Sequence, residues 1–392
     1  MGKKDLLIVT HVQHYIWDDQ IWAFGGYARE VDIWADIFPS IIIASPCIEL
    51  SPPGDCLPLT RKNISVIPVQ TRENSGILKC KFLLFFYLPR IIWKLSKLMR
   101  EAWAVHVRLP GNLGAIGALL APLFSERIIA KYAGTWPNFE GEPKTYRLQK
   151  SLLKSRWFSG PVTVYGDWPN QPDHVIPFFT SILTTDQIEL AKKASEKKHL
   201  HFPSRILFVG RMDRGKNAHI LLDALQILKK YNYSFEARII GDGNQKEELH
   251  QQVLDLGLQS RVTFTGAIPF SSVLENYIWG DILVLTSENS EGWPKAIAEA
   301  MAFGLVCFGS ERGLIPKMLS EKRGVVVDPV TANNLADCLK ELLNSPSTYK
   351  TISKNATEWS QNYSLNGLRK AIKELLIHSW NLKTEEGTLF ER

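Results

Sequence analysis

The 392-residue sequence has few cysteines, and their spacing is not that of a metal site. Its five cysteines are an odd number without paired spacing: Cys47, Cys56, Cys80, Cys307 and Cys338. The sequence also has no Asp-X-Asp element, which would be one way to hold a divalent metal beside a phosphate. We therefore expect a protein of the reduced cytosol that carries no structural metal.

The N-terminus lacks a long hydrophobic run. Residues 1–5 lead directly into a short apolar stretch, Leu6–Thr10, and Asp5 interrupts its start, so we expect no signal peptide. Leu6 stands where a myristoylation signal needs serine or threonine. Internal repeats and low-complexity tracts are also missing, and no Gly-X-Gly-X-X-Gly opens either half, which disfavours a dinucleotide oxidoreductase.

The composition is that of a globular protein. Hydrophobic residues make up 45% of the chain and charged residues 22%, and the length allows two domains with full cores. The formal net charge of +6 is modest and by itself suits a nucleotide sugar, a nucleic acid or an anionic membrane equally well.

Four strand-like apolar runs in the C-terminal half end in polar or glycine turns. The runs are residues 205–209, 237–240, 262–264 and 282–285. Arg211 follows the first run and Lys216 precedes the next helical pattern, so both cations can converge on one anion. In a parallel α/β sheet such turns lie at one edge, where ligands bind. The glycines of these turns are Gly210, Gly241, Gly243 and Gly266.

The stretch from Glu291 to Gly304 carries the strongest chemical signal. Glu291 and Glu299 stand eight residues apart across a Gly-X-Pro turn, and Pro294 suits the first position of the helix that follows. A helix N-terminus binds anions, phosphates above all. Two carboxylates and the N–H groups of this helix N-terminus together can hold a sugar joined to a nucleotide, although two glutamates at this spacing, taken alone, are usually solvated surface. The backbone N–H groups near this N-terminus are those of Gly292, Trp293 and Lys295.

In order and spacing, these pieces resemble glycosyltransferase family 4, whose members are retaining transferases with the GT-B fold. The resemblance covers roughly residues 200–340 well and the N-terminal half more loosely. It implies that Arg211 and Lys216 neutralise the diphosphate of a UDP-, GDP- or ADP-linked sugar. It also implies that Glu299 holds the ribose and that Glu291, with the amides after it, holds the transferred sugar.

The resemblance further implies transfer with retention of the anomeric configuration, with no metal and no other cofactor. We expect a saccharide or lipid-linked acceptor, in cell-envelope or exopolysaccharide synthesis, and no nucleic-acid partner. Two other functions stay open. A GT-B epimerase would use the same donor pocket without an acceptor, and a catalytically silent scaffold would only bind the sugar nucleotide.

The N-terminal half resembles a second α/β unit. A long polar and aromatic loop is expected after the first strand, followed by Gly25 and Gly26 just before a helix. A glycine pair lets the backbone approach a ligand closely. The resemblance implies that this loop faces the donor diphosphate and the acceptor, whereas a plain helix-starting turn is the alternative. The expected strands are residues 6–10, 41–44, 64–69, 104–107 and 128–132.

The sequence departs from the family pattern on the acceptor side. Ala133 stands where many members have a histidine near the reacting sugar carbon, and Arg108 stands at an earlier histidine position. We expect His14, Arg108 and Trp136 to line the acceptor side, and we expect His106, inside a strand, to be structural. These substitutions make the transfer of sugar contacts from the family unsafe.

Residues 77–100 interleave six cations with aromatic and aliphatic side chains, without an acid. The apolar run is shorter than the ~20 residues that a bilayer span needs. A basic amphipathic helix can instead lie in the headgroup region of an anionic membrane, or its apolar face can pack on a sheet. We therefore expect a cytoplasmic protein, with peripheral attachment to the inner face of the cytoplasmic membrane as one of two readings.

We expect an α/β protein with two Rossmann-like, doubly wound domains that face each other across a cleft. Residues 1–190 would form the acceptor-side domain and residues 200–355 the nucleotide-sugar-binding domain. Residues 356–392 would form a helix that returns to the first domain, interrupted near residues 364–367 by a Ser-Leu-Asn-Gly segment.

Overall fold

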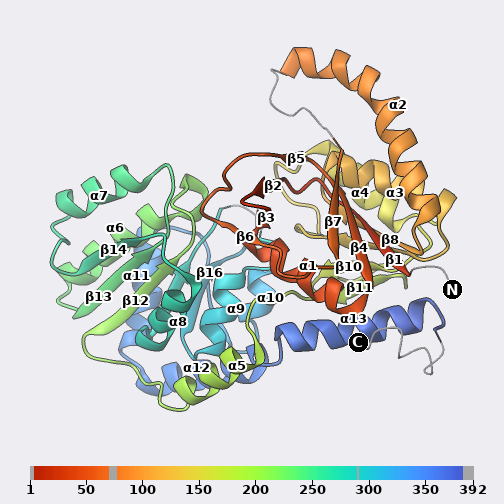
Figure 1. Cartoon of the computed structure of the whole chain (residues 1–392). Helices are drawn as coiled ribbons and strands as arrows, with labels where there is room; N and C mark the ends of the chain where they lie inside the picture. Colours follow the sequence, from red (N-terminus) through yellow and green to blue (C-terminus); the bar gives the residue numbers. More distant parts are fainter. Residues whose placement is uncertain (1–3, 70–76, 289–290, 383–392) are drawn as a thin grey trace. The chain divides into compact units, whose positions relative to one another are not determined.

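The computed structural model describes residues 4–69, 77–288 and 291–382, with the side chains of residues 77–86 left aside. The chain divides into two compact units (Figure 1). The first comprises Met1–Ile182 and Leu365–Arg392, and the second comprises Leu183–Ser364. Helix α12 (Pro346–Ser360) therefore belongs to the second unit, and the returning segment begins at Leu365 rather than at residue 356.

The first unit is built on a seven-stranded parallel sheet. Parallel strands are buried on both faces, and the unbroken apolar run of the first strand, with Leu6 and Val9 fully buried, has that character. In sheet order the strands are β11 (Val175–Phe178), β10 (Val162–Tyr165), β9 (Ile128–Tyr132), β8 (Ala104–Leu109), β1 (Asp5–Val9), β4 (Ser40–Ser45) and β7 (Ile64–Pro68).

Helices cover both faces of this sheet, because alternate residues of a strand point to opposite sides. Leu7 and Val9 point into a core shared with three helices, α2 (Ile77–Glu101), α3 (Asn112–Phe124) and α4 (Lys144–Lys154). Leu6 and Ile8 point into a second core with α1 (Gly25–Ile37) and α13 (Leu365–Ser379). The C-terminal helix thus packs in the core of the first unit.

A hairpin replaces the loop expected after the first strand. Strands β2 (His14–Trp17) and β3 (Gln20–Phe24) pair antiparallel, with β5 (Cys47–Ile48) and β6 (Cys56–Pro58) at their edges. Asp18 and Asp19 form the two-residue turn with φ of 51° and 54°. Aspartate tolerates this left-handed conformation, which the twist of a tight hairpin requires. The expectation of an irregular loop was wrong for this reason.

The second unit has a six-stranded parallel sheet in which the chain reverses its strand order between β12 and β15. In sheet order the strands are β14 (Val262–Gly266), β13 (Phe235–Ile240), β12 (Ser204–Val209), β15 (Ile282–Leu285), β16 (Val306–Ser310) and β17 (Gly324–Val327). Each strand predicted for this half is present.

The helices of the second unit form a chain of contacts. Helix α6 (Ala218–Lys230) contacts α7 (Lys246–Asp255) and α11 (Ala332–Leu343), α11 contacts α12, and α12 contacts α5 (Thr185–Ser195) and α9 (Lys295–Ala302). Helix α8 (Phe270–Trp279) contacts α5. A short 3-10 turn, η1 (Arg214–Lys216), precedes α6, and α10 (Ile315–Leu319) follows β16. A doubly wound sheet of this kind binds ligands beyond the carboxyl ends of its strands, at the point of reversal.

Candidate functional site in the second unit

The carboxyl ends of β12 and β15 mark the strand reversal of the second unit, and the predicted site residues lie in the loops that follow them. Arg211 and Lys216 come after β12, while Glu291 comes after β15. The two loops are joined because the backbone N–H of Glu288 donates to the carbonyl of Gly215 at 2.9 Å. The fold therefore brings the two chemical motifs to one edge of the sheet.

The glycine turns at this edge pack directly on one another. The N–H of Gly210 donates to Ile240 O and that of Gly241 donates to Gly266 O, each at 3.0 Å. A Cβ on Gly241, whose φ is 138°, would lie 1.8 Å from Gly210 O. A Cβ on Gly243 would lie 2.5 Å from Met212 O. Glycine at these two positions is therefore required by the close approach of neighbouring loops, whatever ligand they hold.

Lys216 and Glu291 form an ion pair, which the sequence did not predict, between Lys216 Nζ and Glu291 Oε1. The same carboxylate oxygen accepts a hydrogen bond from Ser287 Oγ at 2.9 Å. Both charged side chains are about one-fifth exposed, so the pair faces solvent at the rim of the sheet. The cation assigned to a diphosphate and the carboxylate assigned to a sugar thus lie in direct contact.

Arg211 is placed differently from Lys216. Its side chain is 75% exposed and pairs with Asp213 at 2.8 Å. This is the surface ion pair that a solvated arginine commonly makes. The structure places Arg211 at the correct strand end, but its guanidinium reaches Asp213 rather than the Lys216–Glu291 pair.

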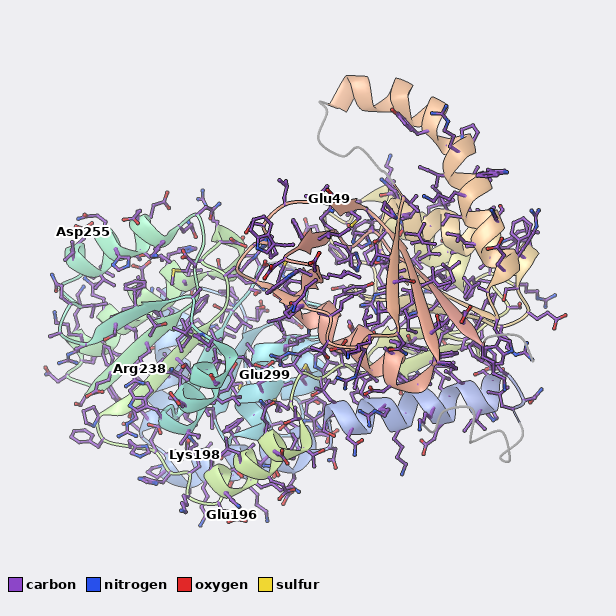
Figure 2. All side chains as sticks on the ribbon, in the orientation of Figure 1. Glu49, Glu196, Lys198, Arg238, Asp255 and Glu299 are labelled. Atoms are coloured by element: carbon purple, nitrogen blue, oxygen red, sulfur yellow. The ribbon has the colours of Figure 1, made fainter. Side chains whose placement is uncertain are left out.

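Glu299 lies on α9 and is almost fully buried, within the body of the second unit (Figure 2). Its Oε2 accepts a hydrogen bond from the hydroxyl of Tyr277, on α8, at 3.0 Å. Tyr277 is fully buried, and burial together with the neighbouring Glu299 raises the pKa of its phenol well above the usual value. The tyrosine therefore remains a hydrogen-bond donor and fixes the orientation of the carboxylate.

The loop before α9 differs in one detail from the expectation. The helix begins at Lys295, and Pro294 caps it with an extended ψ of 90° rather than occupying its first turn. Gly292 and Trp293 precede this cap. The loop is held in place because Leu314 N donates to Glu291 O at 3.0 Å, where a Cβ on Gly313 would lie only 2.1 Å from the same oxygen.

The Trp293 side chain belongs to an aromatic cluster at the end of α12. Its ring stacks on Trp359 with centroids 6.1 Å apart and meets Tyr363 edge-on at 5.2 Å. The guanidinium of Arg323 lies 5.0 Å from the Trp359 ring centroid. This packing fixes the loop from Glu291 to Lys295 against the helix that precedes the return to the first unit.

Sequence reasoning assigned no role to four residues of this site. Asn217 holds a left-handed φ of 58° before α6 and donates from its amide to Thr286 O at 2.7 Å. An asparagine directly before a helix is a recognisable signal for such a conformation. The other three residues are Ser287, Tyr277 and Gly313. They contact segments that are not adjacent to them in the sequence, so no local sequence pattern predicts their role.

Predicted site residues in the first unit

Gly25 and Gly26 are the first two residues of α1 rather than lying just before it as predicted. Gly25 N donates to Asp55 O at 2.9 Å, and a Cβ there would touch Leu57 at 3.1 Å. The glycine at this position therefore serves close backbone packing against the loop before β6.

His14 and Trp136 are buried rather than open to an acceptor. His14 is fully buried, donates from Nδ1–H to Val12 O at 2.9 Å, and meets the Tyr27 ring edge-on. Burial lowers the pKa of His14 to about 4. Trp136 is 1% exposed and donates to Gln171 Oε1 at 2.9 Å. Both side chains pack inside the first unit, which corrects their expected place in an acceptor pocket.

Arg108 is also buried, in an ion cluster at the carboxyl ends of β8 and β9. Its guanidinium donates to Glu30 Oε1 at 2.5 Å, and Lys131 Nζ donates to Glu30 Oε2 at 2.8 Å. Burial opposes ionisation of Glu30, but the two cations hold the pKa of its carboxyl below the usual range. Arg108 is thus anchored within the unit and does not line an open surface.

The remaining sequence assignments of this region are consistent with the structure. His106 is fully buried in β8 beside Trp34, with ring centroids 4.5 Å apart, as expected of a structural histidine. Burial and the neighbouring Arg108 lower its pKa well below the usual value. Ala133 is exposed directly after β9, and its N–H donates to Leu109 O at 2.6 Å.

Comparison with known proteins

Two α/β units, each with a doubly wound parallel sheet, define the GT-B class, and solved structures confirm this fold over the whole chain. A glycosyltransferase from Rickettsia africae ESF-5 superposes with a TM-score of 0.68 at 16% identity, covering 98% of this chain and 100% of that one. Anabaena Alr3699/HepE, solved with UDP and glucose, gives 0.66 at 17% identity, covering 96% and 99%.

Residues 191–359 match the family described as glycosyl transferases group 1. The amylovoran biosynthesis glycosyltransferase AmsK of Erwinia amylovora is 30% identical over 187 residues, which are 45% of this chain and 46% of AmsK. The chain therefore spans about half the length of the relatives it matches. The match falls on the second unit, which contains Lys216, Glu291 and Glu299.

Proposed function

We propose that this protein is a retaining glycosyltransferase that moves a sugar from a nucleotide-diphosphate sugar to a saccharide or lipid-linked acceptor. One observation carries the proposal: the Lys216–Glu291 pair lies at the strand reversal of the second unit, with Glu299 in the same matched region. A cation and two carboxylates at such an edge suit a diphosphate joined to two sugars.

The mechanism follows from where charge develops. As the sugar–phosphate bond breaks, positive charge grows at the anomeric carbon and negative charge grows on the leaving diphosphate. Lys216 stabilises that negative charge, with Arg211 as a second cation from the same strand end. No metal ion is needed in this proposal, and a phosphate oxygen of the leaving group takes the acceptor proton.

Binding of the donor diphosphate would break the ion pair between Lys216 and Glu291. When the diphosphate engages Lys216, Glu291 loses its cationic partner and becomes available to the hydroxyls of the transferred sugar. Ser287 Oγ, which donates to Glu291 in the structure, keeps the carboxylate in place. Glu299, held by Tyr277, receives the ribose hydroxyls.

UDP is the first donor nucleotide to test, since HepE was solved with UDP and glucose. AmsK is named for amylovoran biosynthesis, which supports a role in cell-envelope or exopolysaccharide synthesis. A location on the cytoplasmic side of the membrane is part of the same proposal.

The deciding experiment is a thermal-shift and calorimetric screen of the purified chain against UDP-, GDP- and ADP-sugars. Selective stabilisation by one donor is expected. The anomeric configuration of the product, read by NMR, then tests retention. Release of a rearranged sugar without an acceptor would favour an epimerase, and donor binding without turnover in any acceptor mixture would favour a silent binding protein.

A further inference from the structure

Helices α2, α3 and α4 lie side by side on one face of the sheet of the first unit (Figure 1). Their inner sides share the core described above, through residues such as Leu95, Leu113 and Leu153. Their outer sides form a continuous surface, the α2–α4 face, which none of the site residues uses. This surface combines an excess of positive charge with several exposed large apolar side chains.

The α2–α4 face is strongly basic. From Tyr87 onward α2 contains four lysines and arginines, and α4 contains four, of which Lys150 is buried; Glu101 is the only acid in this part of α2 and in α3 and α4. The helices on the opposite face, α1 and α13, carry four basic and four acidic residues. The excess of positive charge therefore belongs to one side of the unit.

One acid beside α4 reduces this excess without removing it. Glu142, in the preceding loop, is buried and pairs with Lys150 and with Arg147, the latter at 3.4 Å. The cations on the outer side of α2 remain exposed, among them Arg90, Lys97 and Arg100. These side chains are available to an anionic surface.

Large apolar side chains are exposed among these cations. On α2, Trp93 is 69% exposed, and on α3, Leu119 and Leu123 are 49% and 58% exposed. Leu148 of α4 is 71% exposed, and Trp157, which donates from Nε1 to Leu119 O at 3.1 Å, is 45% exposed. A folded soluble surface exposes single apolar residues, but a group spread over three adjacent helices indicates an interaction site.

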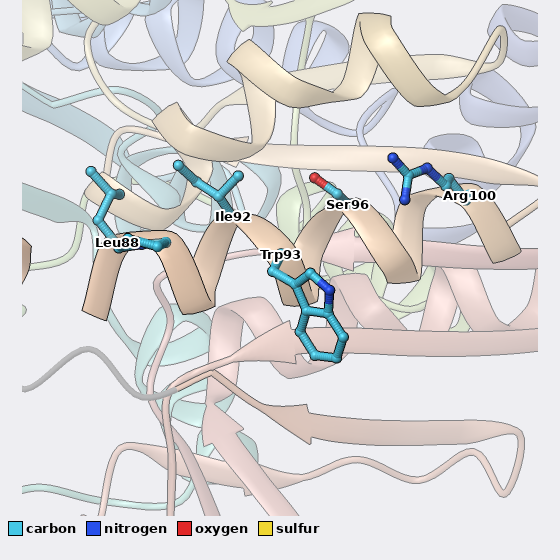
Figure 3. A pocket seen from close by; sticks show the side chains of 6 residues that line it. Leu88, Ile92, Trp93, Ser96 and Arg100 are labelled. Carbon is cyan, nitrogen blue, oxygen red and sulfur yellow. The ribbon is translucent and has the colours of Figure 1, made fainter. Parts of the chain in front are cut away.

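A hollow of about 520 Å³ opens along α2 within this face. Leu88, Ile92, Ser96 and Arg100 line it in a row, one helical turn apart, and Trp93 also borders it (Figure 3). The row is apolar at one end and cationic at the other. Its polarity matches an amphiphile with an acyl chain and an anionic headgroup.

We propose that the α2–α4 face binds the surface of an anionic bilayer. Interleaved cations and exposed tryptophan and leucine side chains suit the headgroup region, where basic side chains meet anionic lipids and apolar ones enter the acyl boundary. No helix in the described part of the chain is long and apolar enough to cross a bilayer, so the contact lies at its surface. Membrane binding itself does not depend on the proposed function. Only its role does, which is to bring the transferase to a lipid-linked acceptor.

The test is flotation of the purified full chain with vesicles, without any nucleotide sugar. We expect binding to phosphatidylcholine vesicles that contain phosphatidylglycerol, weak binding to phosphatidylcholine alone, and loss of binding at high salt. Arg90→Glu with Lys97→Glu should lower the partition coefficient about tenfold or more. Trp93→Ser with Leu123→Ser should lower it as well, because the apolar anchors are removed.

Matched controls come from the second unit, where Lys350 and Leu254 are exposed. Lys350→Glu and Leu254→Ser should leave vesicle binding unchanged. Equal binding to both vesicle types, or no effect of the α2–α3 variants, would overturn the proposal. A dimer in sedimentation that the Leu123→Ser variant dissociates, without vesicle binding, would assign the face to a second copy instead. Donor affinity, measured by calorimetry without vesicles, reports separately on the proposed transferase activity.

Discussion

Lys216 and Glu291, 75 residues apart in the sequence, form an ion pair at the strand reversal of the second unit. The pair joins the loop after β12 to the loop after β15. The two side chains neutralise each other here, whereas in the proposed donor complex Lys216 would bind the diphosphate and Glu291 the transferred sugar. The pair is therefore the natural starting point for testing the proposed chemistry.

Removing the cation should weaken donor binding. Lys216→Ala deletes a charged contact to the diphosphate, so we expect affinity for the nucleotide sugar to fall about ten- to a hundredfold. Adding Arg211→Ala should abolish turnover while the fold remains intact. Isothermal titration calorimetry and circular dichroism measure the two effects. Lys340→Ala, which removes an ion pair with Asp337 on α11, is the control; substantial turnover in the double variant would refute the diphosphate assignment.

The buried Tyr277–Glu299 hydrogen bond makes a second prediction. Glu299→Ala should weaken nucleotide-sugar binding strongly, and Tyr277→Phe should weaken it about three- to tenfold, because the carboxylate loses the donor that orients it. Calorimetry with the preferred donor measures both. Tyr349→Phe removes another buried tyrosine hydroxyl of the same unit, bonded to Asp281 O, and should leave affinity unchanged. Unchanged affinity in Glu299→Ala would exclude the ribose role.

Substitution by alanine should affect stability very differently at two neighbouring glycines, Gly241 and Gly210. The Cβ of Gly241→Ala would overlap Gly210 O, so we expect a loss of about 2–4 kcal/mol in the free energy of unfolding. Gly210→Ala meets its nearest atoms at 3.8 Å, an ordinary contact, and should fold with near-normal stability. Urea denaturation followed by tryptophan fluorescence distinguishes them. Equal stability of the two variants would mean that the turn can shift to admit a methyl group.

Stability should fall in mild acid because His14 is buried uncharged. Its pKa is about 4 in the folded chain, against 6.5 in an ordinary environment, so the unfolded chain binds more protons between these values. The free energy of unfolding therefore decreases as pH falls from 6.5 toward 4, by about 1.4 kcal/mol per pH unit for this group. His14→Phe should flatten the slope, measured by urea denaturation across pH, and His199→Phe, at an exposed site, should not. A slope that the His14 variant leaves unchanged would contradict the assignment.

Turnover should not depend on a divalent metal. Since Lys216 and Arg211 supply the positive charge for the leaving diphosphate in our proposal, activity should persist after dialysis against EDTA. A radiolabelled sugar-transfer assay before and after chelation measures this. Loss of activity that Mg²⁺ or Mn²⁺ restores would overturn the proposal.

Local patterns in the sequence were enough for four of the six strands in the sheet of the second unit, whereas β16 and β17 were not predicted. The two central strands contain unbroken apolar runs, residues 206–209 and 282–285, that end in glycine or polar residues, and burial on both faces favours such a run. The order of these turns, with Lys216, Glu291 and Glu299 among them, was enough for the fold class. In the first unit the β2–β3 hairpin escaped prediction, because its turn consists of Asp18-Asp19 rather than a glycine-containing pair.

The sequence by itself determined the class of fold and the edge of the second sheet at which the candidate site residues lie. Only the tertiary structure decided that Lys216 pairs with Glu291, that Tyr277 holds Glu299, and that Arg108 is buried against Glu30. Periodicity and turn chemistry act over a few neighbouring residues, so a sequence displays them directly. Ion pairs and hydrogen bonds between distant segments depend on how the layers pack, and that packing exists only in the folded chain.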